Sequence, residues 1–220
     1  MFKNKVVVNL FVGFVKLTGI LPALLFFKPK VHYMNKKSQS KRLPKPCILV
    51  SNHKSLLDFV LYLIVFPFRT VRFLMAEVLF NKGAAFGKFL HLIGGIKVDR
   101  DAHNFDFVSD SLQVLDEGGT IGIFPEGRLP IGGKPWPFTV STAFIATHTD
   151  AAIVPVYTDG NYGLFKRTNV MIGEKLYLNE YCDPSLTQEE QLKNLTDILE
   201  KKVCDLRDEL MKRTEKNAGK

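Results

Sequence analysis

Short runs rich in Val and Ile alternate with stretches of helical pattern from residue 47 to residue 172, and this alternation constrains the fold most strongly. The β-like runs are 47–51, 71–75, 96–98, 120–124, 153–157 and 170–172. The helical stretches between them lie near 56–66, 79–92, 104–117 and 137–149. Because strands that alternate with helices bury their apolar faces as a sheet under helical cover, the pattern predicts an α/β fold.

The length of the chain limits the number of domains. At 220 residues it can build one full core, and it is too short for two ordinary domains with a linker. We therefore expect one domain over 47–220, a mixed sheet flanked by helices, preceded by a helical membrane anchor and basic linker over 1–46. The domain should end in an amphipathic helix, since a capping box at Thr187-x-x-Glu190 precedes leucines at three- and four-residue steps.

The apolar run 6–27 is long enough to span a bilayer. However, Asn9, Gly13 and Lys16 form a polar stripe at near-helical spacing, and Pro22 interrupts the run. Lysines also flank both ends, whereas a simple span prefers its positive charge on one side. A helical hairpin or an in-plane helix at the membrane surface fits this pattern better. A true span, a cleaved signal peptide and a buried core helix are the alternatives.

The excess of positive over negative charge lies in the N-terminal part of the chain. The net charge is +8, yet the first acidic residue is Asp58, and eleven Lys or Arg residues precede it. Basic residues interleaved with aliphatic and Phe side chains suit an anionic membrane surface, and we expect the cytoplasmic face. Nucleic acid is a minor alternative because no recognised binding motif accompanies the charge. Three widely spaced cysteines indicate a reducing compartment.

The first candidate site lies where an apolar strand runs into VSNHKSLLD, residues 50–58. On one regular helix His53 and Asp58 would point about 140° apart, so they can meet only if His53 precedes the helix and Asp58 lies in its first turn. Asp58 could then accept a hydrogen bond from one imidazole nitrogen and leave the other to take a proton from a hydroxyl. Ser55-x-x-Asp58 is equally acceptable as a capping box, and the two roles can coexist.

Two further strands end in arginine, within GGIKVDR at 94–100 and IFPEGR at 123–128. Arginine presents planar paired donors that match phosphate oxygens, and Gly127 would let a substrate approach the backbone closely. Taken singly, each arginine is also explained by a surface ion pair. A fourth segment, AIVPVY at 152–157, predicts a buried strand in which Pro155 marks an edge or a bulge.

In this order, the blocks N-H-x4-D, G-x5-R, F-P-E-G-R and I-V-P-V resemble the glycerolipid acyltransferase family typified by 1-acyl-glycerol-3-phosphate acyltransferase. The resemblance covers about 47–172, and the apolar, basic N-terminus is similar to that family's membrane anchor. It implies transfer of a fatty acyl group from acyl-CoA or acyl-carrier protein to the sn-2 hydroxyl of 1-acyl-glycerol-3-phosphate, which forms phosphatidic acid in phospholipid biosynthesis. No metal or organic cofactor is implied.

The resemblance also implies roles for particular residues. His53 is similar to the general base that deprotonates the acceptor hydroxyl, and Asp58 to its orienting partner. The block around Pro155 is associated with accommodation of the acyl chain. The implied acceptor site, with the arginines on the glycerol phosphate group, consists of Arg100, Glu126, Gly127 and Arg128. Backbone N–H groups at the start of the helix after His53 are the expected oxyanion donors.

The sequence departs from the family pattern after F-P-E-G-R. Leu129-Pro130 follows where Ser or Thr is common, which removes a hydroxyl donor, and Lys134 arrives earlier than the usual lysine. These departures concern the acceptor more than the reaction. The alternatives are therefore an acyltransferase that acts on another lysophospholipid or on glycerol 3-phosphate, and a catalytically inactive membrane-binding protein.

Overall fold

In the computed structural model, which describes residues 4–99 and 105–218, one sheet has the strand order β1-β7-β6-β2-β5-β3-β4. The strands are β1 (Lys30–Tyr33), β2 (Cys47–Ser51), β3 (Val71–Ala76), β4 (Ile96–Val98), β5 (Thr120–Ile123), β6 (Ala152–Thr158) and β7 (Asn169–Ile172). The five strands from β6 to β4 are parallel, β7 runs antiparallel to β6, and β1 is parallel to β7. The predicted mixed α/β sheet is confirmed.

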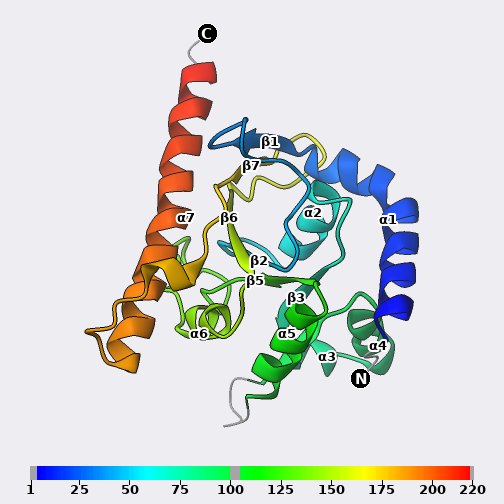
Figure 1. Ribbon diagram of the computed structural model, residues 1–220. Helices are drawn as coiled ribbons and strands as arrows, with labels where there is room; N and C mark the ends of the chain where they lie inside the picture. The colour runs from blue at the N-terminus through cyan, green and yellow to red at the C-terminus, as the bar shows by residue number, and fades with distance from the viewer. Residues whose placement is uncertain (1–3, 100–104, 219–220) are drawn as a thin grey trace.

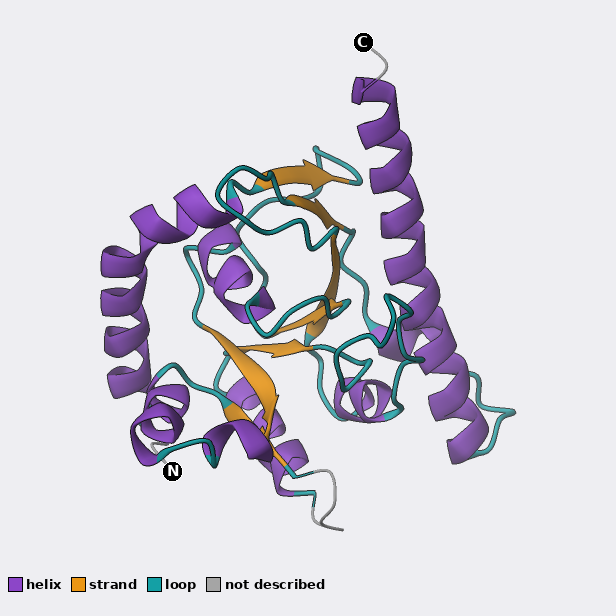
Figure 2. Ribbon diagram, turned by 180° about the vertical axis from the view of Figure 1, so that it is seen from behind, coloured by secondary structure: helices purple, strands orange, loops and turns teal. Residues whose placement is uncertain are grey.

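Helices cover both faces of this sheet (Figures 1 and 2). They are α1 (Lys5–Phe27), α2 (Asp58–Val65), α3 (Glu77–Phe80), α4 (Ala84–Leu92), α5 (Asp106–Asp116), α6 (Ser141–Thr147) and α7 (Gln188–Ala218), with a 3₁₀ turn at Leu178–Tyr181. Because strand side chains alternate between faces, Leu49 packs with α1, α2 and α4, whereas Ile48 packs with α5, α6 and α7. The two layers form one domain around a shared sheet.

The N-terminal helix α1 is a single helix of 23 residues, so the predicted hairpin is wrong. Pro22 lies inside α1, which bends in its second half instead of ending (Figure 1). Its inward side, which carries Val8 and Val12, packs on α2 and α4. By length and composition α1 could cross a membrane.

Residues 30–33 form the edge strand β1, which the sequence analysis did not predict. Lys30 pairs with Asn169, and Tyr33 pairs with Ile172, so the segment after α1 is part of the sheet. The predicted helix over 79–92 is also two helices, α3 and α4, separated by Asn81, Lys82 and Gly83. A four-residue strand and a short break carry too little pattern to be recognised from sequence alone.

Pro155 was expected to mark an edge or a bulge, and the edge is wrong because β6 lies inside the sheet between β7 and β2. Pro155 pairs with Val50 of β2 on one side, and on the other side its carbonyl accepts a hydrogen bond of 2.8 Å from Gly173 N–H. Pro155 has no N–H to return to Gly173, and the β6–β7 ladder ends one pair earlier, at Val156 and Ile172. The missing donor therefore interrupts no ladder, because it falls where pairing with β7 has already stopped.

The long helix α7 begins as the sequence predicts. Thr187 and Glu190 exchange the two hydrogen bonds of a capping box, with Thr187 N–H donating to Glu190 Oε2 at 3.0 Å and Glu190 N–H to Thr187 Oγ1 at 3.4 Å. Its buried face against the sheet consists of Leu195, Leu199, Val203, Leu206 and Leu210. The helix thus covers the face opposite to α2.

Candidate active site

The candidate site begins at the carboxyl end of β2, one of the central strands of the sheet. Ser51 is the last residue of β2, and its hydroxyl shares a hydrogen bond with the Tyr62 hydroxyl of α2. The next residue, Asn52, bonds both backbone groups of Thr158: its Nδ2 donates to the carbonyl at 3.0 Å, and its Oδ1 accepts from the N–H at 2.9 Å. These contacts fix the backbone immediately before His53.

The imidazole of His53 meets the carboxylate of Asp58. His53 Nδ1 lies 2.7 Å from Asp58 Oδ2, and Asp58 is the first residue of α2 and 0% exposed. This is the arrangement that the sequence analysis required for the two side chains to meet. With Nδ1 occupied by the carboxylate, Nε2 is the nitrogen available to a substrate hydroxyl.

The same carboxylate caps the turn before α2. Asp58 Oδ2 accepts from the N–H groups of Lys54 at 2.7 Å and Ser55 at 2.9 Å, and Asp58 Oδ1 accepts from the Tyr162 hydroxyl. Capping and histidine orientation therefore coexist. Oxyanion donors were expected among the N–H groups near the start of this helix, and those of Lys54 and Ser55 are already bonded to Asp58.

Tyr162 was missed by the sequence analysis. Burial, together with the nearby Asp58 carboxylate, raises the pKa of its phenol, so the hydroxyl keeps its proton and acts as a donor. Tyr162 lies in the loop between β6 and β7, more than a hundred residues from Asp58. Nothing in its local sequence beyond neighbouring glycines distinguishes it, and only the fold brings it to the carboxylate.

A column of stacked aromatic rings packs against the imidazole ring of His53. The His53 ring stacks on Phe124 with centroids 4.3 Å apart and planes 10° apart, and Phe124 stacks on Phe73 at 5.5 Å. Beneath them, a Cβ on Gly122 would lie only 2.3 Å from the Phe73 ring. Glycine at this position of β5 leaves the space that the column occupies.

The carboxylate of Glu126 holds two backbone segments of the site together. It is 3% exposed and accepts from the N–H groups of His53 at 2.9 Å and Trp136 at 3.3 Å. Burial raises the pKa of Glu126, and these two hydrogen bonds act in the opposite direction. Glu126 was expected to bind the acceptor; the structure shows its carboxylate bonded to the protein's own amides.

Gly127 and Arg128 follow at the surface. Gly127 has a φ of 66°, a left-handed conformation that favours glycine. The Arg128 guanidinium lies 4.7 Å from the centre of the Trp136 ring, and the Trp136 indole N–H donates to the Leu129 carbonyl at 3.2 Å. Trp136, also missed from sequence, thus fixes both Glu126 and Arg128. Arg100 lies outside the described residues.

One cavity of about 710 Å³ is lined by four of the six predicted site residues. His53, Glu126, Gly127 and Arg128 line it together with Asp99. Most of the remaining wall is apolar, and its members include Phe59, Phe73, Leu74, Met75, Leu90, Phe107 and Ile123. The cavity therefore combines a histidine hydrogen-bonded to a carboxylate and an arginine with a long apolar wall, which suits a ligand with a polar group and a hydrocarbon chain.

Residues 30–159, which contain all of these side chains except Tyr162, match the model of a protein family described as Acyltransferase. The chain belongs to the Acyltransferase family. Among curated members, 1-acyl-sn-glycerol-3-phosphate acyltransferase beta of Homo sapiens is 29% identical over 113 residues, which are 51% of this chain and 41% of that protein. This chain thus spans less than half of the human relative.

Other relatives of this acyltransferase match over more of their length. The 1-acyl-sn-glycerol-3-phosphate acyltransferase of Bacillus subtilis is 25% identical over 169 residues, 74% of this chain and 82% of that protein. Taffazin of Dictyostelium discoideum is 25% identical over 195 residues, 76% and 67%. The crystal structure of the Thermotoga maritima LPA acyltransferase PlsC aligns with a TM-score of 0.58 at 21% identity, covering 91% of this chain and 79% of that one, which supports the fold.

Proposed function

We propose that this protein transfers a fatty acyl group from acyl-CoA or acyl-carrier protein to the sn-2 hydroxyl of 1-acyl-glycerol-3-phosphate. The observation that carries the proposal is the 2.7 Å contact between His53 Nδ1 and Asp58 Oδ2 at a cavity that also contains Arg128. Two curated relatives are named for this reaction. Membership of the Acyltransferase family supports the reaction type, and the acceptor and donor are the finer parts of the proposal.

The chemistry follows from the free nitrogen of His53. Nε2 removes the proton of the acceptor hydroxyl as the oxygen attacks the thioester carbonyl carbon, which forms a tetrahedral adduct. The adduct collapses, the carbon–sulfur bond breaks, and the imidazolium gives its proton to the departing thiolate. Asp58 holds the ring in the correct tautomer and stabilises the imidazolium, and no acyl-enzyme is required.

The cavity offers separate places for the two ends of the reactants. Arg128 presents planar paired donors that match a phosphate, and stacking on Trp136 holds its guanidinium in one orientation. The apolar wall formed by β3, α4 and α5 suits an acyl chain. Arg100 remains a proposed second phosphate ligand on the resemblance alone.

The substrates place the reaction at a lipid surface. Family membership and the exposed apolar side chains of α1 support membrane association, and the basic N-terminal residues favour an anionic surface on the cytoplasmic face. Within the described chain, α1 is packed on α2 and α4 along its inward side. We therefore propose that it lies in the plane of the interface.

An acceptor panel tests the proposed substrate. Purified protein is given a radiolabelled acyl donor, in turn acyl-CoA and acyl-carrier protein, with 1-acyl-glycerol-3-phosphate, other lysophospholipids or glycerol 3-phosphate. We expect labelled phosphatidic acid as the dominant product. Dominant transfer to another acceptor would move the assignment to that acceptor. Failure of every donor and acceptor, with protein that is folded and binds vesicles, would favour an inactive membrane-binding protein.

A further inference from the structure

The outward side of α1 is a continuous apolar stripe. Its members recur at steps of four, four, three, four and four residues, so they share one face of the helix. All are exposed: Val6, Leu10, Phe14, Leu17, Leu21 and Leu25. Exposure of an apolar surface of this length to water is thermodynamically unfavourable, and such surfaces typically contact lipid or protein.

Lys16 keeps this stripe free of charge. Its Nζ turns inward and donates to the backbone carbonyls of Phe66 and Pro67, each at 3.2 Å, and of Arg69 at 2.5 Å. These carbonyls follow the last turn of α2, and the carboxyl end of a helix attracts a cation. The polar residue in the middle of α1 therefore fastens the helix to the domain instead of facing outward.

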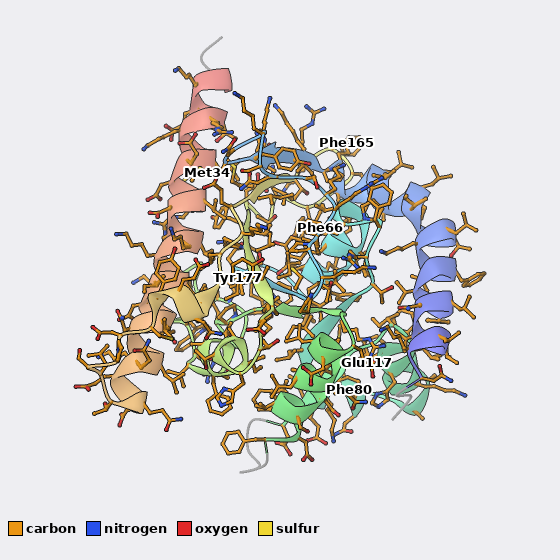
Figure 3. The ribbon with its side chains drawn as sticks, in the orientation of Figure 1. Met34, Phe66, Phe80, Glu117, Phe165 and Tyr177 are labelled. Carbon is orange, nitrogen blue, oxygen red and sulfur yellow. The ribbon has the colours of Figure 1, made fainter. Side chains whose placement is uncertain are left out.

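A second segment, the loop of residues 163–167, lies against the end of α1. The Gly163 N–H donates to the Phe26 carbonyl at 3.3 Å, and the Thr168 N–H donates to the Phe27 carbonyl at 3.0 Å. The loop is therefore held against the last turn of α1. At its tip, Leu164 is exposed and the Phe165 side chain is 99% exposed, at the edge of the molecule beside β1 and α1 (Figure 3).

Basic side chains adjoin this tip. Lys166 and Arg167 follow Phe165 directly, and Lys28 ends α1 beside the same loop; all three are exposed. A fully exposed phenylalanine next to cations is costly for a free surface, but it suits the boundary of an anionic bilayer. There the ring enters the hydrocarbon edge while the cations stay among the headgroup phosphates.

We propose that loop 163–167 is a second membrane contact, in which Phe165 enters an anionic bilayer beside α1 while Lys28, Lys166 and Arg167 bind headgroup phosphates. The inference rests on the membrane association that is part of the proposed function. The loop begins immediately after Tyr162, whose hydroxyl bonds Asp58. One short segment therefore connects the bilayer contact with the carboxylate that orients His53.

Vesicle flotation of the full chain tests the proposal without requiring turnover. Phe165→Ala is compared with Ile131→Ala, since Ile131 is another exposed apolar residue in a different loop. Loss of a buried Phe side chain should lower the partition coefficient by about tenfold or more, and Ile131→Ala should leave it near that of the wild type. Equal partitioning of Phe165→Ala and wild type would overturn the proposal.

A second pair of variants tests the contribution of the basic side chains of the loop. Lys166→Gln with Arg167→Gln should weaken binding to vesicles that contain phosphatidylglycerol by about fivefold or more, but not binding to pure phosphatidylcholine. The control is Lys201→Gln with Lys202→Gln on α7, across the molecule from α1 (Figure 1). An equal loss in both double variants would mean that only net charge matters, which contradicts a specific contact.

Depth measurements and micellar assays separate this proposal from the proposed function. The chain has one tryptophan, Trp136, so Phe165→Trp adds a reporter at the tip. We expect brominated lipids to quench its fluorescence more than that of wild type; quenching equal to wild type overturns the loop contact. Acyl transfer to a detergent-dispersed acceptor should persist in Phe165→Ala. If the wild-type protein transfers acyl groups but does not bind anionic vesicles, the loop contact is overturned while the proposed acyl transfer stands.

Discussion

The Tyr162 hydroxyl donates to Asp58 Oδ1, the carboxylate oxygen opposite to the one that faces His53. Tyr162→Phe removes this donor and leaves the ring in place. The Asp58 carboxylate then holds its negative charge with one fewer hydrogen bond and should stabilise the His53 imidazolium more strongly. We expect the acid limb of the kcat/KM profile to move to higher pH, by up to about one unit.

The pH profile distinguishes this positioning role from simple loss of packing. Tyr177→Phe, which removes an exposed hydroxyl elsewhere, serves as the control. A Tyr162→Phe enzyme with lower activity at every pH but an unmoved acid limb would contradict the electrostatic role of the phenol.

Asp58 also bears on stability. Asp58→Ala leaves the N–H groups of Lys54 and Ser55 without their acceptor beside a buried position, so the free energy of unfolding should fall by about 2–5 kcal/mol. Asp58→Asn keeps an oxygen for these amides and should cost clearly less stability, while still losing most of the activity. Urea denaturation and initial rates on the same preparations measure both effects. Equal destabilisation by the two variants would contradict the capping role.

Gly122 controls the aromatic column under His53. A methyl group in Gly122→Ala would meet the Phe73 ring at 2.3 Å and displace it from its stack with Phe124. We expect a loss of about 1–3 kcal/mol in the free energy of unfolding and a lower kcat, since the His53 ring rests on Phe124. Gly19→Ala, at a position with open space around its Cβ, is the matched control. Unchanged stability and kcat in Gly122→Ala would show that the column can repack freely.

Ala76 tests the use of the apolar cavity. It ends β3 and lines the cavity wall, so Ala76→Phe should shorten the space available to a hydrocarbon chain. We expect kcat/KM for long acyl donors to fall relative to that for short donors, measured as a competition between two chain lengths. Equal loss for both lengths would indicate that the acyl chain lies elsewhere.

The parts of the fold that were predictable are those with repeated local pattern. The buried strands and the capping box of Thr187 and Glu190 are visible in the sequence because periodicity and capping chemistry act over a few residues. The edge strand β1 has four residues and only partial burial, so its sequence carries little signal. The interior position of Pro155 was not predictable, because the sequence does not show that the β6–β7 ladder ends at Val156 and Ile172, just before the proline.

The candidate site was also only partly predictable from the sequence. His53 and Asp58 are five residues apart, so their contact could be derived from helix geometry. Tyr162 reaches Asp58 only through the sheet, because the loop that carries it follows β6 and returns against the end of α1. Glu126 was recognised by its motif, but its bonds to the amides of His53 and Trp136 depend on a loop whose path no local pattern describes.

His53 is the general base of the proposed mechanism, and the kcat of His53→Ala is the sharpest test of that role. Circular dichroism and the urea midpoint establish that the variant is folded, and kcat is measured with saturating donor and acceptor. We expect kcat to decrease by about 10²- to 10⁴-fold with the fold intact. A folded His53→Ala protein that transfers acyl groups at a near-normal rate would contradict this role.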